Sequence, residues 1–336
     1  MQIHEAFSLL PYNTFRIHAK ARFFSTFKNT DELAELLATD SRLPILILGG
    51  GSNILFTKDY DGLVLKNEIK GIEVQHEDAG HVYVKAGAGE NWHRFVLYCI
   101  QHNWAGVENL SLIPGNIGAA PIQNIGAYGV ELDNIFLSLE AYHLQEKKIH
   151  TFTAADCEFG YRDSVFKNRY KDQFAILSVT FRFRKKPIFH VSYGAITEEL
   201  EKMGLSELSI KAVSQAVINI RSSKLPDPEK IANSGSFFKN PEVAANKYEE
   251  LKLRFPGIIA YPLPNGTVKL AAGWMIEQCG WKGYRKGDVG CHAMQALVLV
   301  NYGNATGKEI YDLSEEILQS VNNKFGVILE REVNII

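Results

Sequence analysis

The sequence is poor in cysteine and has no long apolar run. Four cysteines occur among 336 residues, without a CxxC pair or zinc-ligand spacing: Cys99, Cys157, Cys279 and Cys291. A chain this long does not need disulfides to stabilise its core, so we expect reduced thiols and a cytoplasmic protein. No run reaches the ~18 apolar residues of a membrane span, and the N-terminus lacks the basic start and apolar core of a signal peptide. We therefore expect no membrane insertion.

A strong charge of either sign is also lacking. The 36 basic and 38 acidic residues give a net charge of −2, so no basic field attracts nucleic acid or anionic lipid. Ten histidines are scattered without an HExxH helix, so the sequence predicts no metal. No feature indicates an obligatory protein partner. Apolar residues make up 46% of the chain, which is typical of a folded globular protein.

Several catalytic motifs are absent. No G-x-S-x-G elbow occurs, because neither Ser52 nor Ser236 has the second glycine. The nearest match to a P-loop, GNATGKE at 303–309, has three residues between its glycines and no hydroxyl residue after Lys308. The motif LGGGSN at 48–53 fails the dinucleotide fingerprint, since Ile54 stands where a small residue is required. These absences exclude the elbow hydrolases, kinases and ATPases of the P-loop type.

Apolar periodicity predicts a mixture of helices and strands without regular βαβ alternation. Strands are expected at 43–48 and 62–67, as two strands within 72–87, and at 135–145, 175–185 and 327–336. Helices are expected at 91–103, 208–222, 244–255, 271–279 and 306–324. This order favours an α+β protein of more than one lobe over a doubly wound parallel sheet.

Two glycine-rich stretches are candidates for ligand binding. In LGGGSN, three glycines after a strand could turn backbone N–H groups towards phosphate oxygens, or could form only a tight hairpin turn. The stretch 113–129, IPGNIGAAPIQNIGAYG, is too irregular for a helix or strand and too apolar for a disordered segment. We expect it to form an ordered loop that wraps around a ligand.

Four polar residues stand in unusual local sequences. Arg162 lies in GYRDS, Lys224 in SSKLPDP, Ser236 in NSGSFFKNP and Glu332 in LERE. Ordinary alternatives exist, with Arg162 in a surface ion pair, Ser236 in a turn and Glu332 on a solvated strand edge. Taken singly, these residues leave catalysis and ordinary structure both open.

Nine blocks of sequence, in one order, resemble the UDP-N-acetylenolpyruvoylglucosamine reductase (MurB) family of bacterial cell-wall synthesis. The blocks are LGGGSN, GAGENWHRFV, IPGNIGAAPIQNIGAYGVEL, FGYRDSVFK, KLPDP, GSFFKNP, VKLAAGWMIEQCG, QALVLVN and LEREV. They run from about Asn13 to Glu332, nearly the whole chain. Such a series is far more specific than any single glycine motif.

The resemblance implies an α+β fold with a two-lobed FAD-binding region of the vanillyl-alcohol-oxidase (PCMH-like) type and a third, substrate-binding α+β domain. The implied bounds are 1–70 with 327–336 for the first lobe, 71–222 for the second lobe and 223–326 for the substrate-binding domain. FAD would be bound non-covalently. The residues implied to hold it are Gly49, Gly50, Gly51, Ser52, Asn53, Ile113, Pro114, Gly115, Ile117, Gly118, Ala119, Asn124, Gly126, Ala127 and Tyr128.

The resemblance also implies a reaction. NADPH as co-substrate would reduce FAD, and hydride would then pass to the terminal enolpyruvyl carbon of UDP-N-acetylglucosamine enolpyruvate to give UDP-N-acetylmuramate for peptidoglycan. Ser236 matches the proton donor, and Arg162 and Glu332 match residues at the substrate carboxylate. Residues implied to bind the nucleotide sugar are Tyr193, Lys224, Asn240, Tyr261, Lys282 and Gln295, and Tyr193 lies in VSYG, which matches the tyrosine-bearing insertion of one family branch.

The chain departs from the family pattern in two blocks. Ala119 and Ala120 replace small hydroxyl residues, which leaves backbone amides to contact FAD there. In the last block, Arg331 replaces proline and Asn334 replaces a basic residue, which changes the local sequence around Glu332.

Two other functions are compatible with the sequence. An FAD-dependent alcohol or sugar oxidase of the same fold would consume oxygen without NADPH. A non-catalytic UDP-sugar-binding protein would bind the nucleotide sugar and would be colourless when purified.

Overall fold

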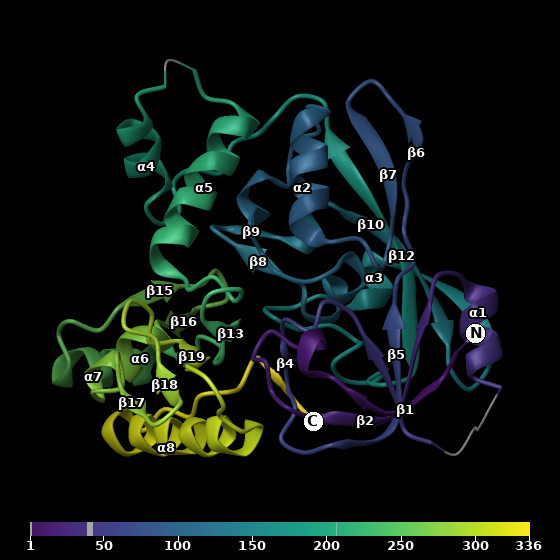
Figure 1. The fold of residues 1–336 in the computed structure, drawn as a ribbon. Helices are drawn as coiled ribbons and strands as arrows, with labels where there is room; N and C mark the ends of the chain where they lie inside the picture. The colour runs from purple at the N-terminus through teal and green to yellow at the C-terminus, as the bar shows by residue number, and fades with distance from the viewer. Residues whose placement is uncertain (1, 39–42, 206) are drawn as a thin grey trace. The chain divides into compact units, whose positions relative to one another are not determined.

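The computed structural model describes residues 2–38, 43–205 and 207–336, which form two compact units (Figure 1). The first unit contains Met1–Phe7, Ala21–Gly51 and Tyr60–Ser223. The second contains Ser8–Lys20, Ser52–Asp59 and Lys224–Ile336. Each unit therefore combines segments that are far apart in the sequence. The finer division into three domains stays a prediction.

A five-stranded antiparallel sheet is the larger sheet of the first unit. Its strand order is β11-β10-β12-β7-β6, with bounds Lys148–Thr153, Phe136–His143, Phe174–Arg184, His81–Gly87 and Ile72–Glu77. Every neighbouring pair in it runs antiparallel. This sheet confirms the expectation of an α+β fold without a doubly wound parallel sheet.

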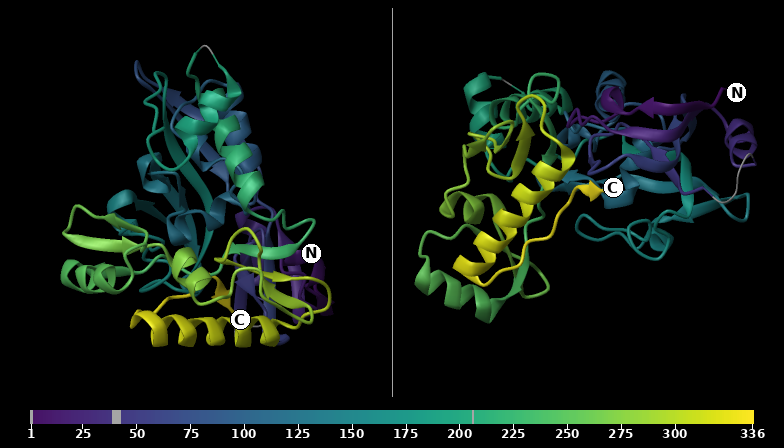
Figure 2. Two further views of the ribbon diagram at one scale, coloured as in Figure 1. Left: turned by 90° about the vertical axis from the view of Figure 1, so that its left-hand side faces the viewer. Right: turned by 60° about the horizontal axis from the view of Figure 1, so that its bottom comes forward.

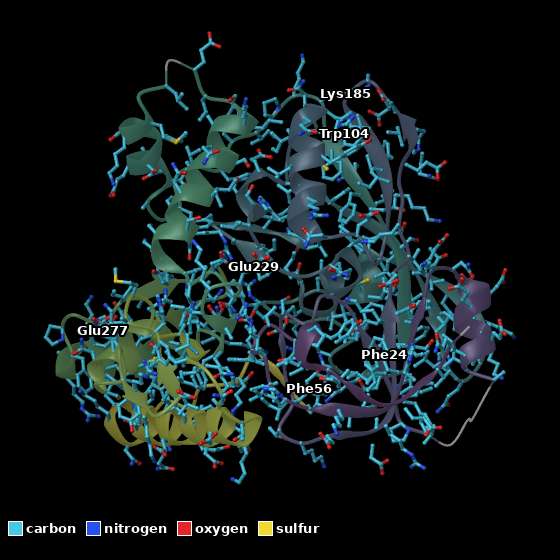
Figure 3. All side chains as sticks on the ribbon, viewed as in Figure 1. Phe24, Phe56, Trp104, Lys185, Glu229 and Glu277 are labelled. Carbon is cyan, nitrogen blue, oxygen red and sulfur yellow. The ribbon has the colours of Figure 1, made fainter. Side chains whose placement is uncertain are left out.

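Helix α2 (Trp92–Gln101) covers one face of this sheet (Figure 1). Asn91 begins the helix, because its side chain accepts the backbone N–H of Arg94 at 3.0 Å. The apolar face of the helix meets β12, where the rings of Phe95 and Phe181 lie 4.9 Å apart. Close to the end of the helix, Trp104 (labelled in Figure 3) stacks on Phe183 with ring centroids 6.2 Å apart. Aromatic packing thus fixes α2 on the sheet.

A smaller sheet of the first unit has the order β1-β2-β5-β3, with bounds His4–Ser8, Lys20–Phe27, Tyr60–Asn67 and Ile45–Leu48. Strand β5 pairs in parallel with both β2 and β3. Helix α1 (Thr30–Leu36) packs its buried Leu33 and Leu36 against this sheet. The sequence analysis missed α1 and β2.

The remaining elements of the first unit are short or lie beyond the sheets. They are α3 (Ala154–Cys157), α4 (Ile196–Met203), α5 (Ile210–Lys224), the two-stranded pair β8 (Gly126–Ala127) and β9 (Val130–Glu131), and the 3-10 turns Glu108–Leu110, Ile117–Ala119, Pro121–Gln123 and Leu132–Asn134. Four of these short elements fall within or just after the 113–129 stretch. That stretch contains no α-helix, as predicted, but the expectation that it also lacks strands is wrong at Gly126–Ala127, which pairs with β9.

The second unit has one four-stranded and one three-stranded sheet. The first has the order β13-β19-β18-β17, with bounds Ala232–Ser236, Val298–Asn301, Val289–Cys291 and Arg285–Lys286. The second has the order β14-β16-β15, with bounds Glu242–Ala244, Thr267–Leu270 and Ala260–Pro262. A short 3-10 turn, Leu10–Tyr12, also belongs here.

Three helices complete the second unit: α6 (Ala245–Arg254), α7 (Ala272–Gln278) and α8 (Gly307–Phe325). Figure 2 shows α8 as the long helix drawn in yellow. Thr306 caps α8 with a reciprocal arrangement in which the Glu309 side chain accepts the Thr306 N–H. No helix in the part of the chain that the structure describes is long and apolar enough to cross a membrane.

The predicted closing strand at 327–336 is wrong in its extent. Only β20 (Asn334–Ile335) is a strand, and it pairs in parallel with β4 (Ile54–Leu55). Residue Arg331 forms one isolated bridge with Phe238. Most of the segment has no continuous neighbouring strand, so it does not form the ladder of backbone hydrogen bonds that defines a strand.

Gly307, at the start of α8, is expected to tolerate no side chain. A Cβ there would lie 1.7 Å from the carbonyl oxygen of Phe56, a residue labelled in Figure 3. Gly307→Ala should reduce the free energy of unfolding by about 1–3 kcal/mol, because main chain must move to relieve the overlap. Urea unfolding would measure the change.

Gly80→Ala is the matched control. The nearest atom to a Cβ at Gly80 is 3.8 Å away, so the free energy of unfolding should change by no more than about 0.5 kcal/mol. Equal losses in the two variants would contradict the steric explanation.

Candidate functional site

The loop Gly49–Gly51 follows β3 and is not a hairpin turn. Strands β3 and β5 run parallel, so the chain crosses over between them and the hairpin alternative is wrong. A Cβ on Gly50 would lie 2.8 Å from the Cα of Gly115, and Gly51 has a φ of 65°. Glycine is therefore required at position 50 by the close approach of another backbone segment, and at position 51 by the left-handed backbone conformation.

The 113–129 loop packs on residues 88–90 of the same unit. The N–H groups of Ile117 and Gly118 donate to the carbonyls of Glu90 and Ala88, at 2.9 Å each. A Cβ on Gly118 would lie 2.6 Å from the Cβ of Ala88, so only glycine fits. These two amides hold the loop in place, and other groups of the loop must supply any contact with a ligand.

Two lysines that the sequence analysis missed support the glycine-rich loops. The Nζ of Lys66 donates to the Gly49 carbonyl, and the Nζ of Lys70 donates to the Gly89 carbonyl. Burial lowers the pKa of Lys66. No sequence signal identified these residues, because Lys66 lies in a strand, where a lysine usually occupies the solvated face, and Lys70 lies in an exposed connection.

The donors around the Gly49–Gly51 loop fit an anionic cofactor. Gly49 and Gly50 have no side chain to cover their main-chain N–H groups, the half-buried Ser52 follows in the sequence, and Lys66 places a cation beside the loop. Backbone N–H groups and an ammonium are the usual ligands of a diphosphate. This donor set fits the diphosphate of FAD.

Arg162 lies in a tight turn of the first unit. Gly160 and Asp163 exchange backbone hydrogen bonds of 3.1 and 3.2 Å, and Arg162 has a φ of 54°. Its Nη2 donates to the carbonyl of Gly126 at 2.5 Å, and its Nη1 lies 3.9 Å from Oε1 of Glu131. A left-handed conformation at a non-glycine residue costs about 1–3 kcal/mol and persists only where its surroundings fix it.

Asn124 fixes this turn and does not offer its side chain to a ligand. It is buried, and its Nδ2 donates to the carbonyl of Gly160 and to Oε2 of Glu131, at 3.1 Å each. Its Oδ1 accepts the N–H of Asp133 at 3.2 Å. Any contact of Asn124 with FAD must therefore come from its main chain.

Ser236 ends β13 at a β-bulge. Between Asn233 and Ser236 the register with β19 shifts by one residue, and Gly235 has a φ of 72°. The Oδ1 of Asn233 accepts the N–H of Gly235 at 2.9 Å and so holds the bulge. Nothing lies within 4 Å of a Cβ on Gly235, so conformation and not space demands the glycine. Bulges of this kind redirect a side chain and are common beside active sites.

Glu332 lies on the segment beside Ser236. Its N–H donates to the carbonyl of Phe237 at 2.8 Å, and the N–H of Lys239 donates to the Glu330 carbonyl at 2.8 Å. Phe237 and Phe238 are fully buried and anchor this strand in the core of the second unit. The structure thus brings Ser236 and Glu332 onto adjacent backbone segments of one unit, whereas Arg162 belongs to the other unit.

The two departures near Glu332 have structural roles. Arg331 donates through Nε to Ser314 at 2.8 Å and through Nη2 to Glu315 at 2.6 Å, which ties the closing segment to α8. Asn334 donates from its N–H and its Nδ2 to the carbonyl of Asn53, at 3.1 and 2.9 Å. Both residues therefore position the main chain on either side of Glu332.

The predicted substrate residues differ in how far their side chains are engaged. Asn240 accepts the N–H of Ala272 and caps α7 at 2.9 Å, and Lys282 pairs with Glu277 at 2.9 Å. Gln295 accepts the N–H of Leu297 at 3.3 Å. Lys224, Tyr261 and, in the first unit, Tyr193 are exposed. Solvent can therefore reach all three of these side chains.

Burial accounts for the chemical state of two cysteines. It raises the pKa of Cys157 and Cys291 to about 12, so these thiols are protonated at neutral pH.

Among residues 2–38, 43–205 and 207–336, no group of three or more His, Cys, Asp or Glu side chains is arranged to hold a metal ion.

Glu108 is a buried carboxylate in the segment that leads into the 113–129 loop. It is 1% exposed, and it accepts the N–H of Gly106 at 2.7 Å. Burial raises its pKa. The neighbouring Asn109 donates to the carbonyls of Tyr128 and His190, at 3.1 and 2.7 Å. The segment therefore anchors the end of the loop.

The raised pKa of Glu108 predicts a pH-dependent stability. Above pH about 4.3, the pKa of a glutamate in the unfolded chain, the folded protein binds more protons than the unfolded chain because the pKa of Glu108 is raised. The stability that protonated Glu108 contributes is therefore fully present below that pH and is lost as pH rises through its folded pKa. Glu108→Gln keeps a side-chain oxygen that can accept the N–H of Gly106, and it removes the ionisable group that causes this loss of stability. We expect Tm to fall less than in the wild type between about pH 4 and about pH 8.

The exposed Glu73 provides the control for this prediction. Glu73→Gln should retain the wild-type dependence of Tm on pH. If Glu108→Gln retained it as well, the buried carboxylate would not be its source.

Comparison with known proteins identifies both parts of the chain. Residues 21–151 match the family model of an FAD binding domain. Residues 227–336 match that of the UDP-N-acetylenolpyruvoylglucosamine reductase C-terminal domain. These matches confirm the expected fold class, an α+β protein with an FAD-binding domain of the PCMH-like type and a separate reductase domain.

Similar proteins cover the entire chain. It is 53% identical to the UDP-N-acetylenolpyruvoylglucosamine reductase of Amoebophilus asiaticus and 50% identical to that of Flavobacterium johnsoniae, over 100% of this chain and of each relative. The crystal structure of the reductase from Thermus caldophilus matches the fold with a TM-score of 0.68 at 23% identity, covering 100% of this chain and 99% of that one. This chain belongs to the UDP-N-acetylenolpyruvoylglucosamine reductase family.

Proposed function

We propose that this chain reduces UDP-N-acetylglucosamine enolpyruvate to UDP-N-acetylmuramate, with NADPH as the hydride source and Ser236 as the proton donor. Family membership makes the chain a flavin-dependent reductase of peptidoglycan precursor synthesis, for which we propose a cytoplasmic location. The observation that carries the finer assignment is the bulge at Gly235, which presents Ser236 beside the segment of Glu332.

The residues of the glycine-rich loops would hold FAD in this reaction. We assign the diphosphate to Gly49–Gly51 and Ser52, with Lys66 as the supporting cation, and the flavin to the accessible groups of the 113–129 loop. Bound FAD supplies the hydride that adds to the terminal enolpyruvyl carbon. The chain's own residues must then orient the substrate, balance the developing charge and deliver a proton.

Ser236 would deliver that proton. Addition of hydride to the terminal carbon places electron density on the adjacent carbon and on its carboxylate. The Oγ–H of Ser236 transfers its proton to the adjacent carbon, which completes the conversion of the enol ether to a lactyl ether. Only a bulged main chain with glycine at its left-handed position allows the hydroxyl to leave the regular side-chain direction of β13.

Arg162 and Glu332 would act at the substrate carboxylate. Arg162 has a permanent charge and a planar fork whose position the Gly126 carbonyl fixes, so it can stabilise the charge that develops there. Glu332 can assist only when it is protonated or acts through a partner, because two carboxylates repel each other.

The nucleotide and sugar would contact exposed side chains. Lys224, Asn240 and Gln295 are assigned to the diphosphate or sugar, and Tyr261 and Lys282 to the uridine. Tyr193 would fold over the bound nucleotide, as in the family branch with the tyrosine-bearing insertion. The 47% exposure of Tyr193 supports this contact.

Single-turnover absorbance of the flavin tests the proposed function. The FAD-loaded protein is reduced anaerobically with NADPH, and UDP-N-acetylglucosamine enolpyruvate is then added. We expect rapid reoxidation of the flavin with formation of UDP-N-acetylmuramate. A reduced flavin that ignores the substrate and reacts only with oxygen would indicate the oxidase, and a colourless protein would indicate a binding protein.

A further inference from the structure

Arg221, near the end of α5, is a half-buried cation that no acidic side chain of the described residues compensates. Its Nε is enclosed and has no hydrogen-bond partner. Nor does its guanidinium form an ion pair within the part of the chain that the structure describes. Other arginines of the chain behave differently, since Arg169 pairs with Glu158 at 2.9 Å and Arg331 pairs with Glu315 at 2.6 Å.

An uncompensated guanidinium in this setting is unfavourable for the isolated protein. Arginine cannot escape by losing its proton, and an enclosed guanidinium N–H without a hydrogen-bond partner is unfavourable. Such a residue is therefore expected where a bound anion completes the site. The missing partner must be a ligand with anionic oxygens, because no carboxylate of the described chain takes that place.

The surroundings of Arg221 contain hydrogen-bond donors from three other elements. Helix α5 packs its buried Val217 and Ile220 against Tyr128. Arg221 lies within electrostatic range of Tyr128, His93 and Arg162, and burial together with the charge of Arg221 lowers the pKa of His93. The Nδ1 of His93 accepts the N–H of Leu112 at 2.9 Å, which leaves Nε2–H as a donor in the neutral ring.

One loop links Arg221 to Arg162. The Gly126 carbonyl accepts from Arg162 at 2.5 Å, and two residues later the Tyr128 ring packs on the helix that carries Arg221. Tyr128 and Arg162 both have left-handed φ values, of 51° and 54°. Strained main chain at both positions is consistent with a loop shaped for a ligand.

We propose that Arg221 is a second guanidinium for the enolpyruvyl carboxylate of the substrate, acting together with Arg162. The inference rests on the proposed function, which assigns Arg162 to that carboxylate. A carboxylate has about four acceptor sites and can take a hydrogen-bond fork from each of two arginines. Binding would remove the repulsion between the two cations and satisfy the enclosed Nε of Arg221.

Ligand titration of two Arg221 variants tests this role. Arg221→Gln removes the charge and Arg221→Lys keeps the charge without the fork. Binding of UDP-N-acetylglucosamine enolpyruvate to the FAD-loaded protein is followed by the flavin absorbance change. We expect Kd to rise about 10- to 100-fold in Arg221→Gln, with partial recovery in Arg221→Lys.

Two further titrations distinguish the anion that Arg221 binds. UDP-N-acetylglucosamine, which has the diphosphate but lacks the carboxylate, should bind Arg221→Gln and wild type within about twofold, as should FAD added to the apoprotein. An equal loss for both nucleotide sugars would assign Arg221 to the diphosphate, and a loss for FAD would assign it to the cofactor. Either result, or unchanged binding of all three ligands, would overturn the proposal.

Thermal unfolding separates a ligand-binding arginine from a structural one. The Tm of the FAD-loaded, substrate-free Arg221→Gln protein should equal or exceed that of wild type, because an unpaired charge with an enclosed, unsatisfied N–H has been removed. A lower Tm would overturn the proposal. The exposed Arg169 is the control, and Arg169→Gln should leave all three dissociation constants unchanged. Failure of the wild-type flavin to respond to the substrate would instead reject the proposed function itself.

Discussion

Replacing Ser236 with alanine is expected to slow reoxidation of the reduced flavin by the substrate about 1,000-fold. The rate of flavin reduction by NADPH should be unchanged, because that step requires no proton from Ser236. Neither the bulge at Gly235 nor the hydrogen bond that the Gly235 N–H donates to Oδ1 of Asn233 involves the Ser236 hydroxyl, so the variant should keep the same backbone. Anaerobic stopped-flow absorbance at the flavin band measures the two half-reactions separately.

Ser234, two residues earlier in β13, is the matched control. Its Oγ is buried and has no hydrogen-bond partner among the described residues, so the hydroxyl stabilises no other group of the described structure. Ser234→Ala should leave both half-reactions at the wild-type rate and slightly increase Tm, since an unsatisfied buried hydroxyl is lost. Similar slowing in the two variants would point to a disturbed strand and not to a lost proton donor.

Ser236→Cys adds a chemical test of the same role. The thiol keeps a transferable proton at the same position, so part of the lost rate should return. The rate should then decline as pH rises through the thiol pKa, which serine does not show in this range. A cysteine variant as slow as alanine at every pH would argue that the hydroxyl only orients the substrate.

Replacing Arg162 with lysine is expected to reduce kcat about 100-fold even though the charge is kept. The guanidinium uses Nη2 to hold the Gly126 carbonyl, and its planar fork of five N–H donors can serve that carbonyl and a carboxylate together. A lysine ammonium cannot make both contacts in the same planar arrangement. Steady-state kinetics and single-turnover reoxidation would measure the loss.

The division between kcat and KM decides what Arg162 does. A loss confined to KM would mean that Arg162 binds the substrate and its transition state equally, which contradicts charge stabilisation in the reaction. Arg169→Lys is the control, because Arg169 lies on the surface and pairs with Glu158 at 2.9 Å. That variant should retain the wild-type kcat and KM.

Local patterns were sufficient to predict the larger elements of the fold. The helices at 91–103, 208–222, 244–255 and 306–324 are observed as α2, α5, α6 and α8 with ends shifted by one or two residues. These predictions succeed because apolar periodicity and capping residues act within a few residues of each other. Helix α1 and the short strands of the second unit were missed, since short elements have little periodicity.

The sequence by itself also determined the chemical type of the site. A glycine triplet after a strand, an irregular apolar loop, and Ser236 between Gly235 and two phenylalanines are local features, and their shared order with a known family identified the reductase. Such information survives in the sequence because the residues that contact a ligand must be of particular types.

Only the tertiary structure decided how those residues are supported. The parallel pairing of β3 with β5 excluded a hairpin at the glycine triplet, and the register shift against β19 placed a bulge directly before Ser236. Lys66 beneath Gly49, Arg331 on α8 and the unpaired Arg221 carried no signal in the sequence. The physical reason is that a lysine or arginine has the same local preferences whether it is solvated, paired or buried. Its role depends on partners that only long-range folding brings within hydrogen-bonding distance.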